Sequence, residues 1–271
     1  MLIDGKKISE EIKATLNGES ASRRIKLAIV QVGEDEASKK FIERKIKFAE
    51  EIGIKTRVYN LPADITTNKL RQKMAEISHI LENDGVILQL PLPARNATHS
   101  VAGGPEQIKT QYVLNGIIVK KDVDVLSSRA FGDFATGHSK ILPPVVEAVK
   151  TIFEAYSIDF KNKNIVIVGA GRLVGKPVAV WLINNNATFS VVDKFTKDLT
   201  SFTKKADIII SGVGKKNLIT PDMIRDGVVI IDVGDAAPEV AEKASLFTPA
   251  IGGLGPLTVA MVFKNLIELN K

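Results

Sequence analysis

The chain has 271 residues, of which 45% are hydrophobic and 25% are charged, and these proportions are typical of a globular protein rather than a disordered one. It contains no cysteine, which excludes a disulfide framework, thiolate zinc ligands and a cysteine nucleophile. Apolar stretches such as Val228–Ile231 are far shorter than the roughly 20 residues that a membrane-spanning helix needs. The first seven residues include one acid and two lysines, so we expect no signal peptide and a cytoplasmic protein.

The chain has a basic excess, which by itself does not indicate a nucleic-acid partner. Lys and Arg number 37 and Asp and Glu number 31, which gives a net charge of +6. Two interpretations stay open, namely a mixed solvated surface with a basic excess, or a concentrated field that attracts an anionic small molecule. Because no basic run is interleaved with aromatic residues, we expect no nucleic-acid partner.

The first half of the chain alternates short apolar runs with segments of helical period. The runs predict strands and the periodic segments predict helices, in chain order Lys26–Gly33, Ser38–Ile52, Lys55–Tyr59, Thr66–Leu81 and Gly85–Leu90. A long polar insert, Ala94–Thr110, is predicted to be a mobile loop.

The second half repeats this alternation. A helix is expected from Pro143 to about Tyr156 and a closing helix over Leu257–Leu269. Between them lie four near-continuous apolar strands of the kind buried in parallel sheets, Asn164–Val168, Thr188–Val192, Asp207–Ile210 and Val228–Asp232. Strand–helix alternation of this kind predicts two α/β domains. We place the break between them after Asp124, in the polar stretch Ser127–Ser139.

A glycine-rich turn carries the strongest local signal. Gly169, Ala170, Gly171, Arg172 and Gly175 follow an apolar strand and open a helix, and the next strand ends at an acidic residue. This spacing lets the backbone approach a pyrophosphate at the helix N-terminus, where free N–H groups favour anions. The context therefore favours dinucleotide binding over a purely structural turn.

Lys45 lies in an apolar stripe of the helix predicted over Ser38–Ile52. Phe41, Phe48 and Ile52 complete this stripe. Such a lysine either snorkels at the edge of the core or is held in a cleft with a shifted pKa. In the second case it is suited to moving protons near neutral pH.

Polar residues follow two other strand-like segments. Gln89 lies within an apolar run and is either a satisfied core amide or a site residue. Asp122 and Asp124 occupy alternate positions, so both face one side if the segment is extended, and this pattern alone favours a solvated charge cluster. The three histidines lack metal-ligand spacing, and no metal is expected.

Six segments in the same order resemble the bifunctional methylenetetrahydrofolate dehydrogenase/methenyltetrahydrofolate cyclohydrolase family. The most specific are the Gln-Leu-Pro-Leu-Pro motif and the Gly-Gly-x-Gly-Pro-x-Thr motif. The segments are Val32-Gly33 with Ser38 and Lys45, Asp84–Pro93, Lys121–Asp124, Gly169–Pro177, Ile231–Gly234 and Thr248–Thr258. They cover nearly the whole chain.

The resemblance implies an enzyme of one-carbon metabolism with two activities. These are NADP-dependent oxidation of 5,10-methylenetetrahydrofolate to the 5,10-methenyl form, and hydrolysis of that product to 10-formyltetrahydrofolate. It implies a folate-side catalytic domain over residues 1–124, joined by the closing helix 257–271, and a Rossmann-type NAD(P)-binding domain over residues 140–250. It further implies an active-site cleft between the domains and a homodimer built through the cofactor domains.

The resemblance also assigns roles to single residues. Lys45 becomes the leading catalytic candidate, Gln89 assists it, and Asp124 holds the pterin ring by hydrogen bonds. The other substrate-binding candidates are Phe41, Leu90, Gly252 and Gly253.

Several residues depart from the family pattern around the expected folate site. Phe41 replaces a tyrosine, Val125 replaces a glycine, and Ile251 replaces a proline. Leu142 and Pro143 stand where the family has Cys-Thr. The insert after Pro93 is longer than usual and the segment after Gly234 is shorter.

Cofactor choice depends on neighbouring residues of opposite charge. Asp193 ends the second strand of the predicted Rossmann unit, and an acid there binds the ribose 2′-hydroxyl of NAD. Lys194 and Arg172 can instead bind a 2′-phosphate, and the resemblance favours NADP. Asp235 is a further cofactor candidate.

Two alternatives are kept. A shikimate-dehydrogenase-like oxidoreductase has a similar layout, but the His-Asn pair expected to hold its substrate is missing. A non-catalytic dinucleotide-binding regulator explains the glycine-rich turn but not Lys45, Gln89 and Asp124.

Overall fold

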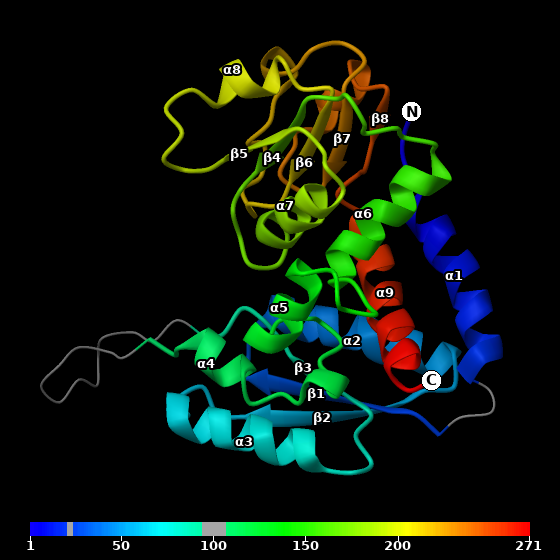
Figure 1. Ribbon diagram of the computed structural model, residues 1–271, viewed down its shortest axis with the longest axis vertical. Helices are drawn as coiled ribbons and strands as arrows, with labels where there is room; N and C mark the ends of the chain where they lie inside the picture. Colours follow the sequence, from blue (N-terminus) through cyan, green and yellow to red (C-terminus); the bar gives the residue numbers. More distant parts are fainter. Residues whose placement is uncertain (21–23, 94–106) are drawn as a thin grey trace, which may run out of the picture. The chain divides into compact units, whose positions relative to one another are not determined.

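The computed structural model describes residues 1–20, 24–93 and 107–271, and the chain divides into two compact units. We call Lys13–Leu142 with Val262–Lys271 the Lys45 unit, and Met1–Ile12 with Pro143–Met261 the glycine-turn unit. Each unit contains a parallel sheet with helices, which confirms the expected pair of α/β domains (Figure 1). The domain ranges 1–124 and 140–250 and the cleft stay predictions.

The sheet of the Lys45 unit has three parallel strands in the order β2-β1-β3. Their bounds are β1 Lys26–Val32, β2 Lys55–Leu61 and β3 Gly85–Leu88. All residues of β1 except the first are buried, because this strand has a neighbour on each side and helices over both faces. The carboxyl ends of parallel strands meet at one edge, so Gln89 lies at this edge directly after β3.

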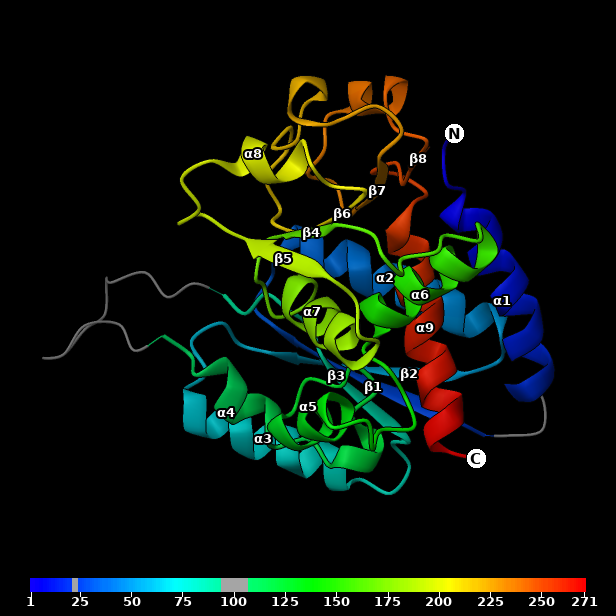
Figure 2. The same cartoon turned by 45° about the horizontal axis from the view of Figure 1, so that its top comes forward.

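Helices α2 (Glu36–Glu51) and α3 (Thr67–His79) lie on opposite faces of this sheet (Figures 1 and 2). Each begins after a capping side chain, Asp35 for α2 and Thr66 for α3, which accepts a hydrogen bond from a first-turn N–H. A short helix, α4 (Thr110–Leu114), packs against α3.

The closing helix α9 runs from Leu254 to Leu269, which confirms the predicted helix with an N-terminal extension. Its last part belongs to the Lys45 unit. A Cβ on Gly85 would lie 2.5 Å from the Leu266 side chain and 2.8 Å from that of Val123. Glycine at this position therefore lets α9 pack closely against β3.

The stretch predicted as the interdomain break contains a helix instead. Helix α5 spans Ser128–Ala135, and the Ser127 side chain caps it by accepting from the Ala130 N–H. Ala130 and Phe134 lie four positions apart and are both buried. The polar composition of the stretch masked the helical period of this helix. The boundary between the two compact units lies later in the chain, at Pro143.

The glycine-turn unit contains a five-stranded parallel sheet in the order β5-β4-β6-β7-β8. Its strands are β4 Ile165–Val168, β5 Phe189–Val192, β6 Ile208–Ser211, β7 Val229–Asp232 and β8 Leu246–Phe247. Its helices besides α9 include α6 Pro144–Ala155, α7 Gly175–Asn184 and α8 Leu199–Thr203 (Figure 2). Strand order reverses at β4, and ligands of such sheets bind at the carboxyl ends of the strands at this point.

A first helix, α1 (Gly5–Ser20), is missing from the sequence prediction. Ile8, Ile12 and Leu16 recur every four residues and were its available signal. Its first residues belong to the glycine-turn unit, where a Cβ on Gly5 would lie 2.0 Å from the carbonyl oxygen of Gly253. Glycine is therefore required at this contact.

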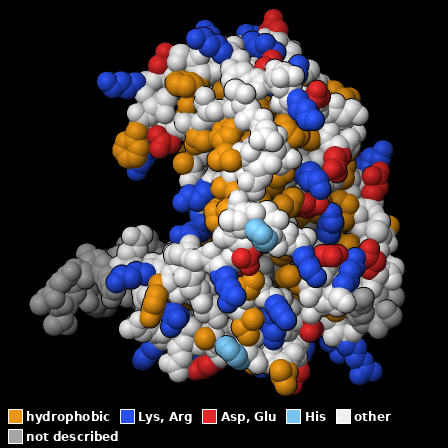
Figure 3. Space-filling model, in the orientation of Figure 1, with side chains coloured by type: hydrophobic (Ala, Val, Ile, Leu, Met, Phe, Trp, Pro, Cys, Tyr) orange, Lys and Arg blue, Asp and Glu red, His pale blue; other side chains and the backbone are white. Residues whose placement is uncertain are grey.

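Charged side chains of both signs are intermixed on the face that Figure 3 shows. This distribution favours the mixed solvated surface over a concentrated basic field on that face. No helix within the described part of the chain is long and apolar enough to cross a membrane. Most of the predicted loop Ala94–Thr110 lies outside the described residues.

Candidate active site

Lys45 lies on the buried face of α2. The buried side chains of this helix are Ser38, Ile42, Lys45, Phe48 and Ala49. The Lys45 side chain does not snorkel to solvent, because the residue is only 9% exposed and its Nζ donates a 2.8 Å hydrogen bond to Gln89 Oε1. The lysine therefore occupies an interior polar site.

The Gln89 amide is held on both sides. Its Nε2 donates to the carbonyl oxygen of Leu90 at 2.8 Å, which leaves Oε1 directed toward Lys45. Gln89 is 8% exposed, so its hydrogen bonds replace those lost to water. The amide is thus satisfied in the core, and one of its partners is the candidate catalytic ammonium.

Burial perturbs the titration of both charged groups in this site. It lowers the pKa of Lys45, and the carboxylate of Asp124 partly opposes this effect. Burial also raises the pKa of Asp124 to about 6, while Lys45 lowers it and Asp122 raises it. A lysine of lowered pKa beside a carboxyl of raised pKa is suited to proton transfer.

Asp122 and Asp124 do not form the solvated charge cluster that the sequence pattern favoured. Asp122 is 1% exposed, and its carboxylate accepts hydrogen bonds from the N–H groups of Leu126 and Ser127. The segment is a turn rather than an extended strand, since the Val125 N–H donates to the Asp122 carbonyl oxygen. The two carboxyl groups therefore lie in different surroundings, because Asp122 binds backbone N–H groups whereas Asp124 interacts with Lys45.

Phe41 does not belong to the buried face of α2, contrary to the predicted stripe. Its side chain is 44% exposed, and the Arg44 guanidinium lies 5.6 Å from the ring centroid. Ile42 occupies the buried position instead. An exposed aromatic ring one turn before Lys45 offers a flat surface to a ligand.

The glycine-rich turn has the geometry that a bound dinucleotide requires. A Cβ on Gly175 would lie 1.7 Å from the carbonyl oxygen of Gly169, so helix α7 packs against the end of β4 only with glycine there. Gly169 has a φ of +98°, which favours glycine. Only the Gly212 carbonyl oxygen, at 3.9 Å, lies near a Cβ on Gly171, and Ala170 and Arg172 are exposed. The turn thus offers open backbone at the N-terminus of α7, and these residues fit the cofactor.

The two opposing residues for cofactor choice lie in the loop after β5. Asp193 Oδ1 accepts a 2.9 Å hydrogen bond from the Phe195 N–H, and Lys194 Nζ lies 5.0 Å from the Phe195 ring centroid. Both residues are exposed. The carboxylate is therefore engaged with its own loop.

Asp235 is 1% exposed and organises the loop after β6. Its carboxylate accepts from the Ser211 hydroxyl at 2.8 Å and from the N–H groups of Val213, Gly214 and Lys215. The carboxylate thus has four partners inside the protein.

Gly252 and Gly253 have conformational reasons to be glycine. Gly252 has a φ of +81°, and a Cβ on Gly253 would lie 2.2 Å from the carbonyl oxygen of Pro249. Ile251 beside them is 92% exposed. An apolar side chain so exposed is available to a ligand.

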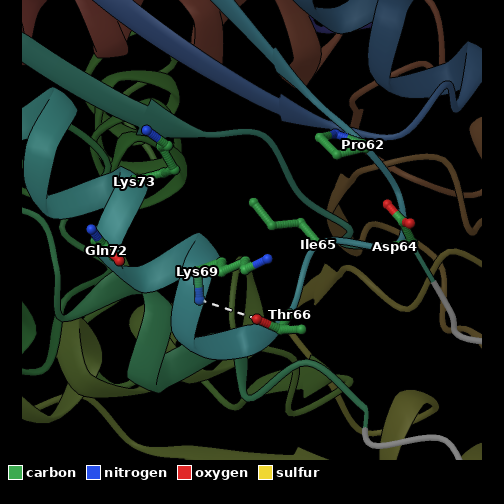
Figure 4. Close-up of a pocket in the computed structure, with 7 residues that line it drawn as sticks. All are labelled: Pro62, Asp64, Ile65, Thr66, Lys69, Gln72 and Lys73. Carbon is green, nitrogen blue, oxygen red and sulfur yellow. Dashed lines mark hydrogen bonds between the residues drawn. The ribbon is translucent and has the colours of Figure 1, made fainter.

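A separate pocket of about 410 Å³ lies at the start of α3 (Figure 4). Its lining residues are Pro62, Asp64, Ile65, Thr66, Lys69, Gln72 and Lys73. None of them is a predicted site residue. Among the described residues, no group of three or more His, Asp or Glu is arranged to hold a metal ion.

Sequence models of two domains match the chain. The tetrahydrofolate dehydrogenase/cyclohydrolase catalytic domain matches residues 3–124, and the NAD(P)-binding domain of the same family matches residues 143–271. The chain belongs to this family. The predicted family is therefore confirmed.

Relatives in the tetrahydrofolate dehydrogenase/cyclohydrolase family match over their full length. The bifunctional protein FolD of Nautilia profundicola is 37% identical, over 100% of this chain and 97% of the relative. The crystal structure of the bifunctional FolD enzyme from Campylobacter jejuni has 36% identity and a TM-score of 0.89, over 99% of this chain and 98% of that one. The Trypanosoma brucei enzyme, solved with NADP and an inhibitor, has 27% identity and a TM-score of 0.89, over 99% and 96%.

Family membership disfavours the two alternatives, because both domain models are those of the folate enzymes rather than of shikimate dehydrogenases or regulators. Sequence reasoning assigned Asp122 to a solvated cluster and did not single out Asp232, yet both carboxylates are buried beside candidate site residues. The Asp232 carboxylate accepts from the N–H groups of Gly234, Asp235 and Ala236, and so shapes the turn before Asp235. Its position at the end of β7 was the available signal.

Proposed function

We propose that this chain oxidises 5,10-methylenetetrahydrofolate with NADP and hydrolyses the resulting 5,10-methenyltetrahydrofolate to 10-formyltetrahydrofolate. One observation carries the proposal: the buried Lys45–Gln89 hydrogen bond of 2.8 Å, beside the perturbed carboxyl of Asp124. These residues lie within the segment that the catalytic-domain model matches.

Lys45 is the residue suited to the hydrolytic step. Attack of water on the methenyl carbon requires removal of a proton, and opening of the ring requires a proton at nitrogen. A lysine whose pKa is lowered by burial can accept the first proton and return the second. Gln89 fixes the direction of the ammonium, since its own amide is fixed by Leu90. The neighbouring Phe41 has no hydroxyl, so lysine acts without a phenol partner.

The other folate-side candidates hold the substrate. Asp124 presents a half-buried carboxyl beside Lys45 and is suited to hydrogen bonds with the pterin ring. Phe41 and the half-buried Leu90 offer apolar surface. We assign Gly252 and Gly253 to substrate binding because the adjacent Ile251 side chain is exposed and available to a ligand.

Substitution of Lys45 by methionine tests the hydrolytic assignment. Lys45→Met should lower the rate of methenyltetrahydrofolate hydrolysis by at least about 100-fold, because a general acid–base contributes 10²–10⁴-fold. Lys47→Met is the matched control, since it makes the same change at an exposed position of the same helix. Hydrolysis by Lys45→Met at the rate of the control would remove Lys45 from the mechanism.

NADP is the cofactor that the glycine-turn unit suits. When bound, it supplies the hydride acceptor. Gly169, Ala170, Gly171 and Gly175 provide the backbone cradle for the pyrophosphate. Asp235 acts through the loop whose N–H groups it holds rather than by touching the cofactor.

Preference for NADP over NAD rests on the loop after β5. Asp193 accepts from the Phe195 N–H, so its carboxylate is engaged away from a ribose, whereas Lys194 and Arg172 are exposed cations suited to a 2′-phosphate. Lys194→Ala should lower kcat/KM for NADP by about 10-fold or more and leave that for NAD unchanged, since a charge-assisted contact contributes about 1.5–3 kcal/mol. Lys197→Ala, an exposed lysine of the same loop, is the control. If Lys194→Ala kept the preference for NADP unchanged, the 2′-phosphate would bind to residues other than Lys194.

We also propose a homodimer built through the glycine-turn units. Strand β5 is at the edge of its sheet, and its Val191 is 42% exposed. Such an edge is able to pair with a second copy, and sedimentation velocity measures the state. A cytoplasmic location fits a chain without cysteine.

A further inference from the structure

Asp122 is a buried carboxylate that the proposed reaction does not use. It is 1% exposed, although an unpaired charge in the interior is strongly unfavourable. Within the described part of the chain no lysine or arginine forms an ion pair with it, and the adjacent Lys121 directs its Nζ to the Ile80 carbonyl oxygen at 2.9 Å. Its partners are backbone N–H groups of its own segment, so its carboxylate fixes the path of the chain there.

These partners close a turn around Asp124. Asp122 Oδ2 accepts from the Leu126 N–H at 3.1 Å and from the Ser127 N–H at 2.7 Å. The carboxylate therefore joins the chain two residues before Asp124 to the chain two and three residues after it. Ser127 in turn caps helix α5, which extends the ordered region.

The amino-terminal side of this turn is anchored to the rest of the Lys45 unit. Asp122 forms a parallel bridge with Val86 of β3. The Val123 carbonyl oxygen accepts a 2.9 Å hydrogen bond from Nδ2 of the buried Asn265 on α9. Within the described residues, the side-chain hydrogen bonds that join this anchored side to Leu126 and Ser127 are those of the Asp122 carboxylate.

Val125, directly after Asp124, shows that the turn is tightly constrained. Its φ is +56°, in the left-handed region that β-branched residues rarely adopt. Such a conformation persists only where the surrounding structure imposes it. The hydrogen bonds from the Leu126 and Ser127 N–H groups to the Asp122 carboxylate span Val125 and are suited to impose it.

We propose that Asp122 is a positioning residue that holds the Asp124 carboxyl beside Lys45. The proposal rests on the proposed role of Asp124 in binding the folate. Asp122 does not touch the substrate in this scheme, and it acts through the turn of residues 122–127.

Its charge gives a second effect on Asp124. The charged groups that act on Asp124 are Lys45 of α2, which lowers its pKa, and Asp122, which raises it. From β3 and α9, the uncharged Val86 and Asn265 contact the neighbouring residues Asp122 and Val123. A substitution that removes the charge of Asp122 but keeps the shape of its side chain should therefore lower the pKa of Asp124.

Asp122→Asn and Asp122→Ala in the full chain test this positioning role. Asn keeps one acceptor oxygen and removes the charge, whereas Ala removes both. The Asp124 carboxyl is titrated directly by carbon-13 NMR without substrate, with Asp124→Asn identifying its signal. We expect a lower Asp124 pKa in Asp122→Asn, and a KM for methylenetetrahydrofolate raised about 10-fold in Asp122→Ala, with a smaller change in kcat.

Asp84→Asn is the matched control, because Asp84 also accepts a backbone hydrogen bond, from the Lys26 N–H at 2.8 Å, at the other end of the sheet. It should leave the Asp124 titration and the KM unchanged. A wild-type Asp124 titration in Asp122→Asn together with a wild-type KM in Asp122→Ala would overturn the positioning role. If Asp124→Asn itself left KM unchanged, the substrate role of Asp124 would be wrong, and the NMR titration would still decide whether Asp122 governs Asp124.

Discussion

At the scale of single residues, the perturbed groups of the site depend on burial more than on charge pairing. Burial is the largest cause of the shifted pKa values of Lys45, Asp122 and Asp124. The charges of Lys45 and Asp124 each offset part of the effect of burial on the other group's pKa. The site thus keeps proton-active groups in an interior where each alone would be strongly unfavourable.

The raised pKa of Asp124 predicts a pH-dependent stability. The carboxyl has a pKa of about 6 in the folded chain against an ordinary value of 3.8. Protonation therefore stabilises the fold fully below pH 3.8, and this stabilisation is lost as pH rises through 6. Relative to Asp124→Asn, the free energy of unfolding of the wild type should fall by up to about 3 kcal/mol between pH 4 and 7.

Urea unfolding at several pH values measures this difference. The same pair compared in a Lys45→Met background should show a larger fall, because the ammonium that lowers the pKa of Asp124 is gone. A wild-type-minus-variant difference that stays constant from pH 4 to 7 would contradict the prediction.

At the scale of elements, α9 completes the polar contacts of the Lys45 unit. Asn265 is 3% exposed, and its Nδ2 donates to the carbonyl oxygens of Val123 at 2.9 Å and Leu142 at 2.8 Å. Asn265→Ala leaves both carbonyl groups without this donor and should lower the free energy of unfolding by about 2–4 kcal/mol.

Denaturant unfolding measures this effect, with Lys264→Ala as the control on an exposed position of the same helix. The control should change the free energy of unfolding by no more than about 0.5 kcal/mol. Equal effects of the two substitutions would mean that the carbonyl groups find other partners.

At the scale of the whole molecule, neither compact unit is a continuous piece of chain. The last ten residues belong to the Lys45 unit, and the first twelve belong to the glycine-turn unit. The Phe263 ring stacks on Phe48 of α2 with a centroid distance of 5.2 Å. The C-terminal segment therefore contributes core side chains to the unit that carries Lys45.

Truncation after Met261 should unfold the Lys45 unit and spare the other. It removes four buried apolar side chains, those of Val262, Phe263, Leu266 and Ile267, which contribute roughly 6–12 kcal/mol together. A loss of this size is comparable with the whole free energy of unfolding of a typical domain, which is about 5–15 kcal/mol. Amide hydrogen exchange should become fast in β1–β3 while β4–β7 stay protected. Retained protection in β1–β3 would contradict the prediction.

Local pattern in the sequence determined much of the architecture. Strands β1–β7, helices α2, α3, α6 and α9, and the glycine-rich turn follow from periodicity and glycine spacing, because these features depend on neighbours a few residues away. The two-residue strand β8 was not predicted. The family followed from motifs in a fixed order, and the two domain models confirm it.

Tertiary structure alone decided the surroundings of the polar residues. Lys45 and Gln89 are 44 positions apart and meet because α2 and the end of β3 border the same sheet. The pattern at Asp122 favoured a solvated cluster, yet the carboxylate is buried among backbone donors that only the folded turn brings together. The contact of Lys45 depends on a partner distant in sequence, and that of Asp122 depends on a turn whose shape no local pattern reports. A strand's apolar period, in contrast, reports only which of its faces is buried.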